Sequence, residues 1–313
     1  MKQDSLNCLF LFFFLLFIPG PGYSAEQVSF QKGVKTGTVF DPQLSEISGI
    51  FSSWKTRDVL WVVNDSGNPA ELYAISSGGK FLNAFSVEGA DNIDWEDMSG
   101  FRHNGKGYLI IGDIGDNKAR RDFCTLYAVS EPNAAPSLTE QSLPIQWQMH
   151  FKYADGPRDC EALAVDETRQ RIYLLSKRDK YPVLYELPLS FDPEDTLYTA
   201  TPVARIRTIP QPTPADLKEK YGKHRSRPTS MDISSNGRTL VILTYKHGYL
   251  YRRHPGQTWD QAVESPPELL PLPDTGELVQ REALCIDREK NNIIVTTEQI
   301  PAPIYTFTPR VTP

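Results

Sequence analysis

Polar residues that could bind a cation recur at one position of a repeated sequence pattern. In each copy, the polar residue opens a short apolar segment, a second apolar segment follows, and a third segment is centred on Tyr. The recurring residues are Ser48, Glu96, Glu161, Ser230 and Glu282. Carboxylate and hydroxyl oxygens suit a hard cation with flexible geometry, which favours Ca²⁺ over Zn²⁺. The pattern therefore predicts a calcium site built from these five residues.

The same five residues have an alternative interpretation that needs no metal. Three glutamates on one narrow axis repel each other, and at ~6 Å with an effective dielectric of 20 each pair costs roughly 3 kcal/mol. A cation, shared protons or nearby arginines would relieve this repulsion. In the alternative, the five residues cap strand ends and pair with Arg158, Arg227 and Arg281, which precede three of them.

A second set of polar residues follows the second apolar segment of each copy. Asp65, Asp113 and Asp116 could act as a general base, or could be turn residues at strand ends, since Asp favours such positions. Basic residues could bind an anionic substrate through charge-assisted hydrogen bonds, or could form a solvated or glutamate-paired cluster. These basic residues are Arg158, Lys177, Arg178, Arg227 and Lys246.

The elements that must position these residues are short strands. The recurring polar residues are separated by 48, 65, 69 and 52 residues, and the segments between them are β-branched and aromatic, with turns rich in Gly, Pro, Asn and Asp. Four-stranded antiparallel units repeated in this way are typical of a β-propeller. We predict an all-β fold with five blades, with six blades as the alternative. Antiparallel pairing places the start of each first strand beside the end of each second strand, so both sets of residues meet at one mouth of the central channel.

The two ends of the chain complete one repeat between them. The chain after Glu282 is too short for a further unit, and the residues between Glu26 and Ser48 supply the missing length. We therefore expect an N-terminal strand, at 28–34 or 36–40, to add the outer strand of the last blade and close a single domain over residues 26–313.

The order Ser, Glu, Glu, Ser, Glu at the starts of the inner strands resembles the central calcium site of the calcium-activated nucleotidases, the apyrase family, which are five-bladed propellers. The resemblance extends from about Ser45 to Phe307. It implies that the five residues surround calcium. The loops 64–67 and 112–116 lie where the family contacts nucleotide but differ in sequence. The chain also resembles uncharacterised exported bacterial propeller proteins.

The N-terminal residues are typical of an export signal. Residues 9–18 are an unbroken apolar run, too short to span a bilayer, followed by Pro-Gly-Pro-Gly and by Ser24-Ala25. We predict a signal peptide over residues 1–25, a periplasmic or extracellular location, and no membrane span after cleavage. The net charge of −6 and the lack of a long basic run argue against a nucleic-acid partner. The remaining cysteines, Cys124, Cys160 and Cys285, are odd in number and are expected to be buried thiols.

Two functions fit these observations. The first is a secreted, calcium-dependent hydrolase of a phosphate-bearing or otherwise anionic small molecule. The second is a non-catalytic module in which calcium is structural and the channel mouth binds a ligand or an unknown protein. The sequence alone leaves open whether the protein is an enzyme, because propellers support many unrelated functions.

Overall fold

The computed structural model describes residues 29–135, 142–190, 197–273 and 280–310. The predicted signal peptide at residues 1–25 lies outside them. The regular secondary structure of the described chain is almost entirely β-strand, as predicted. No helix among the described residues is long and apolar enough to cross a membrane.

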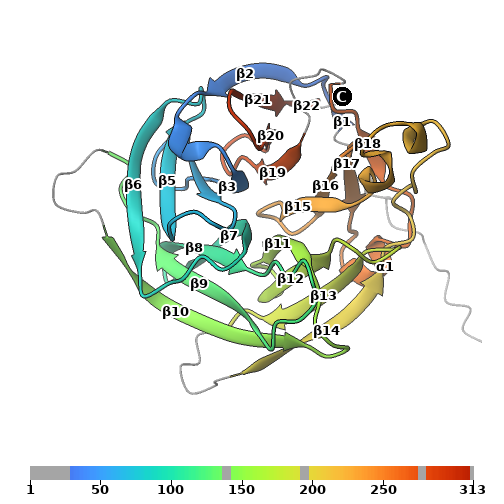
Figure 1. The fold of residues 1–313 in the computed structure, drawn as a ribbon, viewed down its shortest axis with the longest axis horizontal. Coiled ribbons are helices and arrows are strands. Elements are labelled where there is room, and N and C mark those ends of the chain that lie inside the picture. Colours follow the sequence, from blue (N-terminus) through green and yellow to red (C-terminus); the bar gives the residue numbers. More distant parts are fainter. Residues whose placement is uncertain (1–28, 136–141, 191–196, 274–279, 311–313) are drawn as a thin grey trace, which may run out of the picture.

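The strands form consecutive four-stranded antiparallel groups, each running from the molecular centre to its edge (Figure 1). The first two groups are β3 (Ile47–Ser52), β4 (Val59–Asn64), β5 (Glu71–Ser76) and β6 (Phe81–Glu88), then β7 (Trp95–His103), β8 (Lys106–Asp113), β9 (Cys124–Ser130) and β10 (Ser142–Tyr153). The third and fourth are β11 (Cys160–Asp166), β12 (Arg171–Ser176), β13 (Val183–Pro188) and β14 (Tyr198–Arg205), then β15 (Pro228–Ile233), β16 (Thr239–Thr244), β17 (Gly248–Arg252) and β18 (Glu268–Leu270). The last consists of β19 (Arg281–Ile286), β20 (Ile293–Thr297), β21 (Ala302–Phe307) and the N-terminal β2 (Val34–Val39). This radial arrangement of sheets is propeller-like.

The first strand of each group lies beside the first strand of the next. β3 contacts β7, β7 contacts β11, β11 contacts β15, β15 contacts β19, and β19 contacts β3. These inner strands are buried along nearly their whole length. The five inner strands surround a central channel and all begin at the same end of it. We call this end the mouth.

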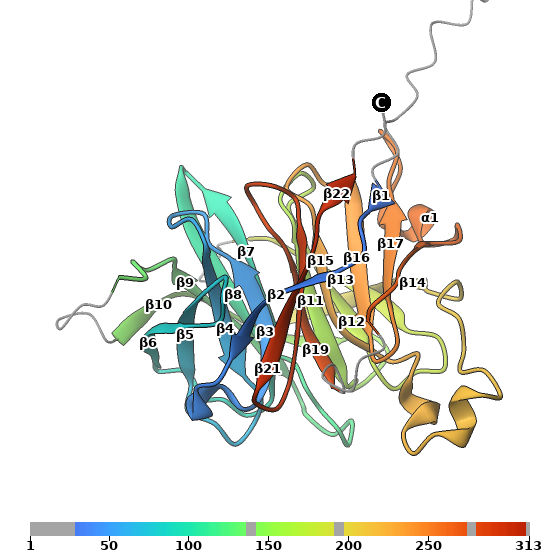
Figure 2. The ribbon, with the colours of Figure 1, turned by 90° about the horizontal axis from the view of Figure 1, so that it is seen from above.

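Short parallel pairings connect the outer strands of the first three groups. β6 pairs with β10 over three residues, and β10 pairs with β14 over three residues, so these groups form one twelve-stranded sheet. The fourth and last groups remain separate four-stranded sheets. Figure 2 shows the molecule from the side, with the small β1 (Ser29–Phe30) and β22 (Pro309–Arg310) paired near the two ends of the described chain.

The N-terminal strand was expected at 28–34 or 36–40, and β2 (Val34–Val39) covers most of the second range. Its hydrogen-bonding partners in β21, far away in sequence, determine which of its residues join the sheet.

The blades are packed by large apolar side chains. Trp61 and Trp95 are fully buried, and both lie in clusters of apolar side chains. Cys124, Cys160 and Cys285 are buried free thiols, as expected. The helical elements are short: η1 (Pro42–Leu44), η2 (Asp216–Lys218), η3 (Gly222–His224) and α1 (Trp259–Ala262).

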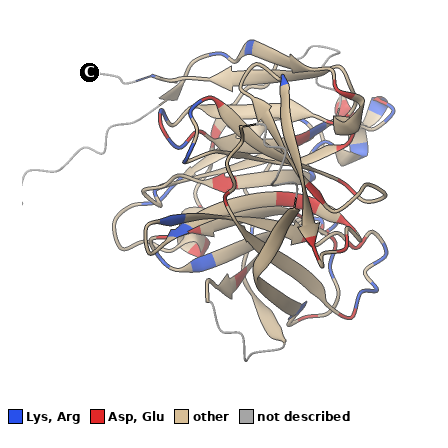
Figure 3. Ribbon diagram, turned by 90° about the vertical axis from the view of Figure 1, so that its left-hand side faces the viewer, with Lys and Arg blue, Asp and Glu red and all other residues tan. Residues whose placement is uncertain are grey.

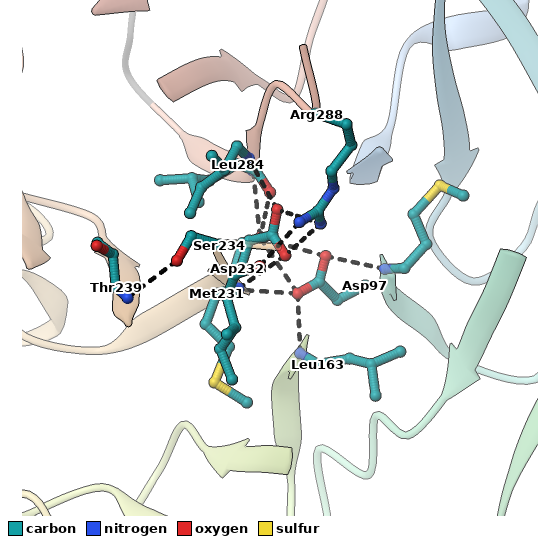
Figure 4. A network of polar contacts seen from close by, with 12 residues as sticks. Asp97, Leu163, Met231, Asp232, Ser234, Thr239, Leu284 and Arg288 are labelled. Carbon is teal, nitrogen blue, oxygen red and sulfur yellow. Dashed lines mark hydrogen bonds and ion pairs between the residues drawn. The ribbon is translucent and has the colours of Figure 1, made fainter. Parts of the chain in front are cut away.

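A buried aspartate joins three inner strands inside the channel (Figure 4). Asp97 of β7 is 0% exposed, and its carboxylate accepts hydrogen bonds from the backbone amides of Leu163 in β11 (2.9 Å) and Met231 in β15 (3.3 Å). Ser230 Oγ donates to the same carboxylate at 3.2 Å. Asp232 of β15 makes an analogous link to the last group, because it accepts from Ile286 N at 2.8 Å and pairs with Arg288. These bonds fix the relative positions of the strands that carry the candidate site.

Candidate functional site

A β-bulge at the start of every inner strand selects the side chains at the channel mouth. In each group the register shifts by one residue where the first strand meets the end of the second. The extra residues are Ser48, Glu96, Glu161, Thr229 and Glu282. Bulges re-aim side chains, so these five residues occupy equivalent positions around the channel.

Ser230 is not one of the five, which corrects the sequence-based prediction. The bulge lies between Pro228 and Ser230, so Thr229 takes the equivalent position and Ser230 lies one residue deeper, on Asp97. The hydrogen bonds agree with this register. Ser48 Oγ donates to Trp95 O at 3.0 Å, and Thr229 Oγ1 donates to Arg281 O at 2.7 Å, in each case the carbonyl just before a mouth glutamate.

Two of the three mouth glutamates have protein partners. Glu161 forms an ion pair with Lys177, whose side chain is also buried. Glu282 accepts a hydrogen bond from Tyr245 Oη at 2.8 Å. Burial raises the pKa of Glu161 to about 7 although Lys177 opposes the shift, and burial raises the pKa of Glu282 to about 8.

Glu96 differs from both. Its side chain is 6% exposed, and within the described residues its carboxylate receives no hydrogen bond and forms no ion pair. Burial, followed by the negative charges of Glu161 and Asp65, raises the pKa of Glu96 well above its ordinary value. A buried carboxylate without a donor is costly, because hydrogen bonds or a counter-charge must replace the lost water.

Two acidic triads share Glu96. Carboxylate oxygens of Asp65, Asp94 and Glu96 lie within 4.8 Å of one another, as do those of Glu96, Asp159 and Glu161. The second triad is compensated by protein cations, because Arg178 pairs with Asp159 and Lys177 pairs with Glu161.

The first triad lacks a paired cation. Within the described residues no Lys or Arg side chain lies within ion-pair distance of Asp65, Asp94 or Glu96. Burial and the charge of Asp65 raise the pKa of Asp94 to about 6, and burial also raises the pKa of Asp65. Asp65 was predicted as a general base, and its position makes it a candidate cation ligand.

Gly115 makes room for the first triad. A Cβ atom at this position would lie 2.5 Å from Asp94 Oδ2 and 2.5 Å from Glu96 Oε1. The backbone of the loop after β8 therefore approaches the two carboxylates as closely as only glycine allows. The donor set and this close approach fit a hard cation bound by oxygen ligands. Ligands on opposite sides of Ca²⁺ are separated by about 4.6–5.2 Å, compatible with the spacing of the triad.

The other two predicted general bases hold local structure. Asp113 is fully buried, pairs with Arg121 at 2.6 Å, and accepts a hydrogen bond from Asp94 N at 3.1 Å. Asp116 accepts from the backbone amides of Arg120 (2.6 Å) and Arg121 (2.8 Å), which closes a turn. The turn interpretation therefore describes the contacts of Asp116, whereas Asp113 holds Arg121 and the backbone before Glu96.

The predicted substrate-binding residues divide into two groups. Lys177, Arg178 and Arg227 lie at the mouth. Burial and the neighbouring Arg178 lower the pKa of Arg227, and its side chain makes no hydrogen bond or ion pair within the part of the chain that is described. Arg158 instead binds Asp155 (2.9 Å) and Tyr185 (2.9 Å). Lys246 binds Asp216 of the insertion before β15 at 2.7 Å.

Sequence reasoning missed Asp94, Asp159 and Tyr245. The first two precede mouth glutamates by two positions, as Asp-Trp-Glu and Asp-Cys-Glu, and the same offset from Thr229 gives Arg227. The backbone confirms the equivalence, because the amides of Asp65, Lys177 and Tyr245 bond to the carbonyls of Glu46, Asp159 and Arg227. The Asp-x-Glu spacing could have revealed both aspartates.

Charges of both signs are interspersed on the loops (Figure 3). Acidic and basic segments alternate along the loops visible in this view, and neither sign covers the visible face alone. The candidate site has a local separation of charge, between the acidic triad that no protein cation pairs with and Arg227, which pairs with no carboxylate in the described chain.

Comparisons with known proteins identify no family. No protein-family model matches the sequence, and no curated protein matches it. Similar solved structures include a luciferin-regenerating enzyme, with a TM-score of 0.45 and 10% identity, covering 88% of this chain and 95% of that chain. Another is the Dos1 propeller, with a TM-score of 0.36 and 13% identity, covering 83% of this chain and 59% of that chain. With such low scores, the functional argument rests on the chain's own residues.

Proposed function

We propose that the protein is a five-bladed β-propeller whose channel mouth binds a calcium ion between Asp65, Asp94 and Glu96. Pairing of β2 with β21 supports closure by the N-terminal strand, because it supplies the outer strand of the last group. The observation that carries the cation proposal is Glu96, a buried carboxylate without a protein donor beside two further carboxylates.

The proposal modifies the ring that the sequence suggested. Lys177 already neutralises Glu161, and Tyr245 hydrogen-bonds Glu282, so the cation is placed off the channel axis, toward the loops that carry Asp65 and Asp94. Both aspartates are only partly buried, which leaves the bound cation open to a ligand from solvent.

We further propose that the site hydrolyses a phosphate-bearing or similarly anionic small molecule. A bound calcium ion would polarise an anionic oxygen or a water molecule. Arg178 and Arg227 would hold the anionic group through charge-assisted hydrogen bonds, and the side chain of Arg227 has no competing partner in the described chain. Glu161, whose pKa is raised by burial to about 7, would accept a proton near neutral pH.

One observation favours the second candidate, a non-catalytic ligand- or protein-binding propeller with structural calcium. Asp113 Oδ1 and Asp116 Oδ2 are engaged in local bonds, so two of the three predicted general bases are held in structural contacts. In both candidates we propose export to the periplasm or beyond, as the N-terminal residues suggest.

The first experiment measures calcium binding by the protein without its signal sequence. Calorimetry and thermal unfolding are compared for the native protein, Glu96→Gln, and a control, Asp122→Asn, which alters an exposed aspartate. We expect calcium to raise the unfolding temperature of the native protein and the control. Glu96→Gln should lower calcium affinity by at least about tenfold, equivalent to 1.4 kcal/mol.

A hydrolysis assay then separates the two candidates. A panel of phosphomonoesters, phosphodiesters and nucleotides is tested with calcium and with chelator. Turnover that requires calcium and is lost in Arg227→Ala would support the hydrolase. Calcium binding without turnover of any compound would support the binding module, and the absence of calcium binding would contradict both.

A further inference from the structure

A hollow lies on the face opposite the mouth, between the third and fourth groups of strands. It is formed by the turn after β11, the turn between β15 and β16, and the loop after β17, all at the far ends of these strands from Glu161 and Thr229. Its volume is about 440 Å³. This lies within the range of about 300–1,000 Å³ that small-molecule sites occupy.

The side of this hollow nearest the core is built around Arg253, which is 9% exposed. Its guanidinium lies 2.8 Å from the carboxylate of Asp166 and stacks over the ring of Trp259, with Cζ 4.5 Å from the ring centroid. The same aspartate accepts a hydrogen bond from Trp259 Nε1 at 3.0 Å. Arg253 is therefore a fixed cation whose charge one buried carboxylate balances.

Two further arginines line the hollow without a balancing carboxylate. Arg169 donates to the carbonyl of Gln257 at 2.7 Å, and Arg238 makes no side-chain hydrogen bond or ion pair within the described residues. His254 lines it as well, and none of its described lining residues is Asp or Glu. The hollow thus carries an excess of about two positive charges, from Arg169 and Arg238. Like charges that line one hollow repel each other.

The backbone of the turn between β15 and β16 leaves little space around Arg253. A Cβ atom at Gly237 would lie 2.5 Å from Thr168 Oγ1 and 2.7 Å from Arg253 Nη2. Gly237 also has φ of +65°, which glycine adopts without strain. The two turns therefore meet closely at the base of the hollow, and Arg169 and Arg238 are held on different strand groups around it.

We propose that this hollow is a binding site for a doubly charged anionic group, such as a phosphate or diphosphate, held by Arg169 and Arg238. An anion between the two guanidiniums would offset their repulsion and accept hydrogen bonds from their free N–H groups. The site is separate from the calcium site, because the two lie at opposite ends of the inner strands. The anionic group could belong to a free small molecule or to a phospholipid headgroup.

The test uses inorganic pyrophosphate as a free anion and phosphatidylglycerol vesicles as a headgroup surface, with phosphatidylcholine vesicles for comparison. Binding is measured without added calcium for the native protein and for Arg169→Ala and Arg238→Ala. We expect each substitution to weaken binding of one or both anionic probes at least about tenfold, since each removes a charged hydrogen-bond donor. Both arginines are surface residues, so folding is checked by circular dichroism.

Two control variants make the outcome specific. Arg57→Ala removes an exposed arginine from a turn on the same face, and Arg227→Ala removes an arginine from the mouth. Loss confined to Arg169→Ala and Arg238→Ala supports the site, and the probe that binds identifies the source of the anion. Failure of both anionic probes to bind, or loss caused equally by Arg57→Ala or only by Arg227→Ala, would overturn the proposal.

Discussion

At the level of single residues, three glutamates in equivalent positions have different partners. Glu161 has an ammonium group, Glu282 has a phenol, and Glu96 has no protein donor in the described chain. The repeat places an identical side chain three times, and its partners come from different places. Lys177 follows the second strand of the same group as Glu161, whereas Tyr245, which bonds Glu282, follows the second strand of the preceding group. The chemistry of the mouth therefore depends on the residues that follow the second strands.

Removal of Lys177 tests the ion pair. Lys177→Met leaves the buried carboxylate of Glu161 without its counter-charge, so we expect a loss of about 3 kcal/mol in the free energy of unfolding. Urea denaturation at neutral pH measures the effect. The double variant Lys177→Met/Glu161→Gln should recover most of this loss, because no unpaired charge remains. Equal instability of the single and double variants would contradict the role of the pair.

The raised pKa values of Glu161 and Glu282 predict how stability depends on pH. Their values of about 7 and about 8 exceed the unfolded value of 4.5, so the folded protein holds more protons between these limits. Stability of the metal-free protein should therefore decrease as the pH rises through about 7 to 8. Urea denaturation from about pH 5 to about pH 9, after removal of metal, measures this trend. A metal-free protein that becomes more stable over this pH range would contradict the prediction from these two glutamates.

At the level of the element, the loop after β8 lies directly against the acidic triad. Gly115→Ala would place a methyl group against Asp94 and Glu96, so we expect a loss of calcium affinity and a destabilisation of about 1–3 kcal/mol from overpacking. Gly78→Ala is the control, because the nearest atom to its Cβ would be Ser76 Oγ at 3.7 Å. Calorimetry with calcium compares the two. Unchanged affinity in Gly115→Ala would place the cation elsewhere.

The sequence predicted the inner strands and the end of the channel where their polar residues meet, because an apolar segment opened by a polar residue recurs with a Tyr-centred segment behind it. It did not predict the register of β15. Thr229 and Ser230 are adjacent hydroxyl residues. A β-bulge places Thr229 at the mouth and Ser230 against Asp97, and the residue types do not reveal where the bulge lies. The roles of Asp113 and Asp116 were similarly open, since turn residues and general bases have the same side chain.

At the level of the whole molecule, β2 connects the first and last parts of the chain. It pairs with β21, and Thr38 N in β2 donates to Gly78 O in the turn between β5 and β6 at 3.2 Å. Its last residue, Val39, is fully buried among side chains of both groups. The N-terminal strand therefore stabilises two groups of strands at once.

A truncated chain tests this role. Removing residues up to Val39 should lower the unfolding temperature and promote association, because it leaves the edge of β21 with unpaired backbone groups. The matched control begins at Glu26 and keeps β2. Thermal unfolding and analytical ultracentrifugation compare the two chains. Equal unfolding temperatures and equal monomer content would show that β2 is dispensable.

The pairing of outer strands divides the circumference unequally. β6, β10 and β14 tie three groups into one continuous sheet, whereas no strand pairing among the described residues joins β14 to β18. The third and fourth groups are joined instead by side chains, because Arg253 and Trp259 of the fourth group both bind Asp166 of the third on the face opposite the mouth. Arg178 and Arg227 lie on the two sides of the same border at the mouth. An anion that bridges these two guanidiniums would therefore join the third and fourth groups at the mouth as well.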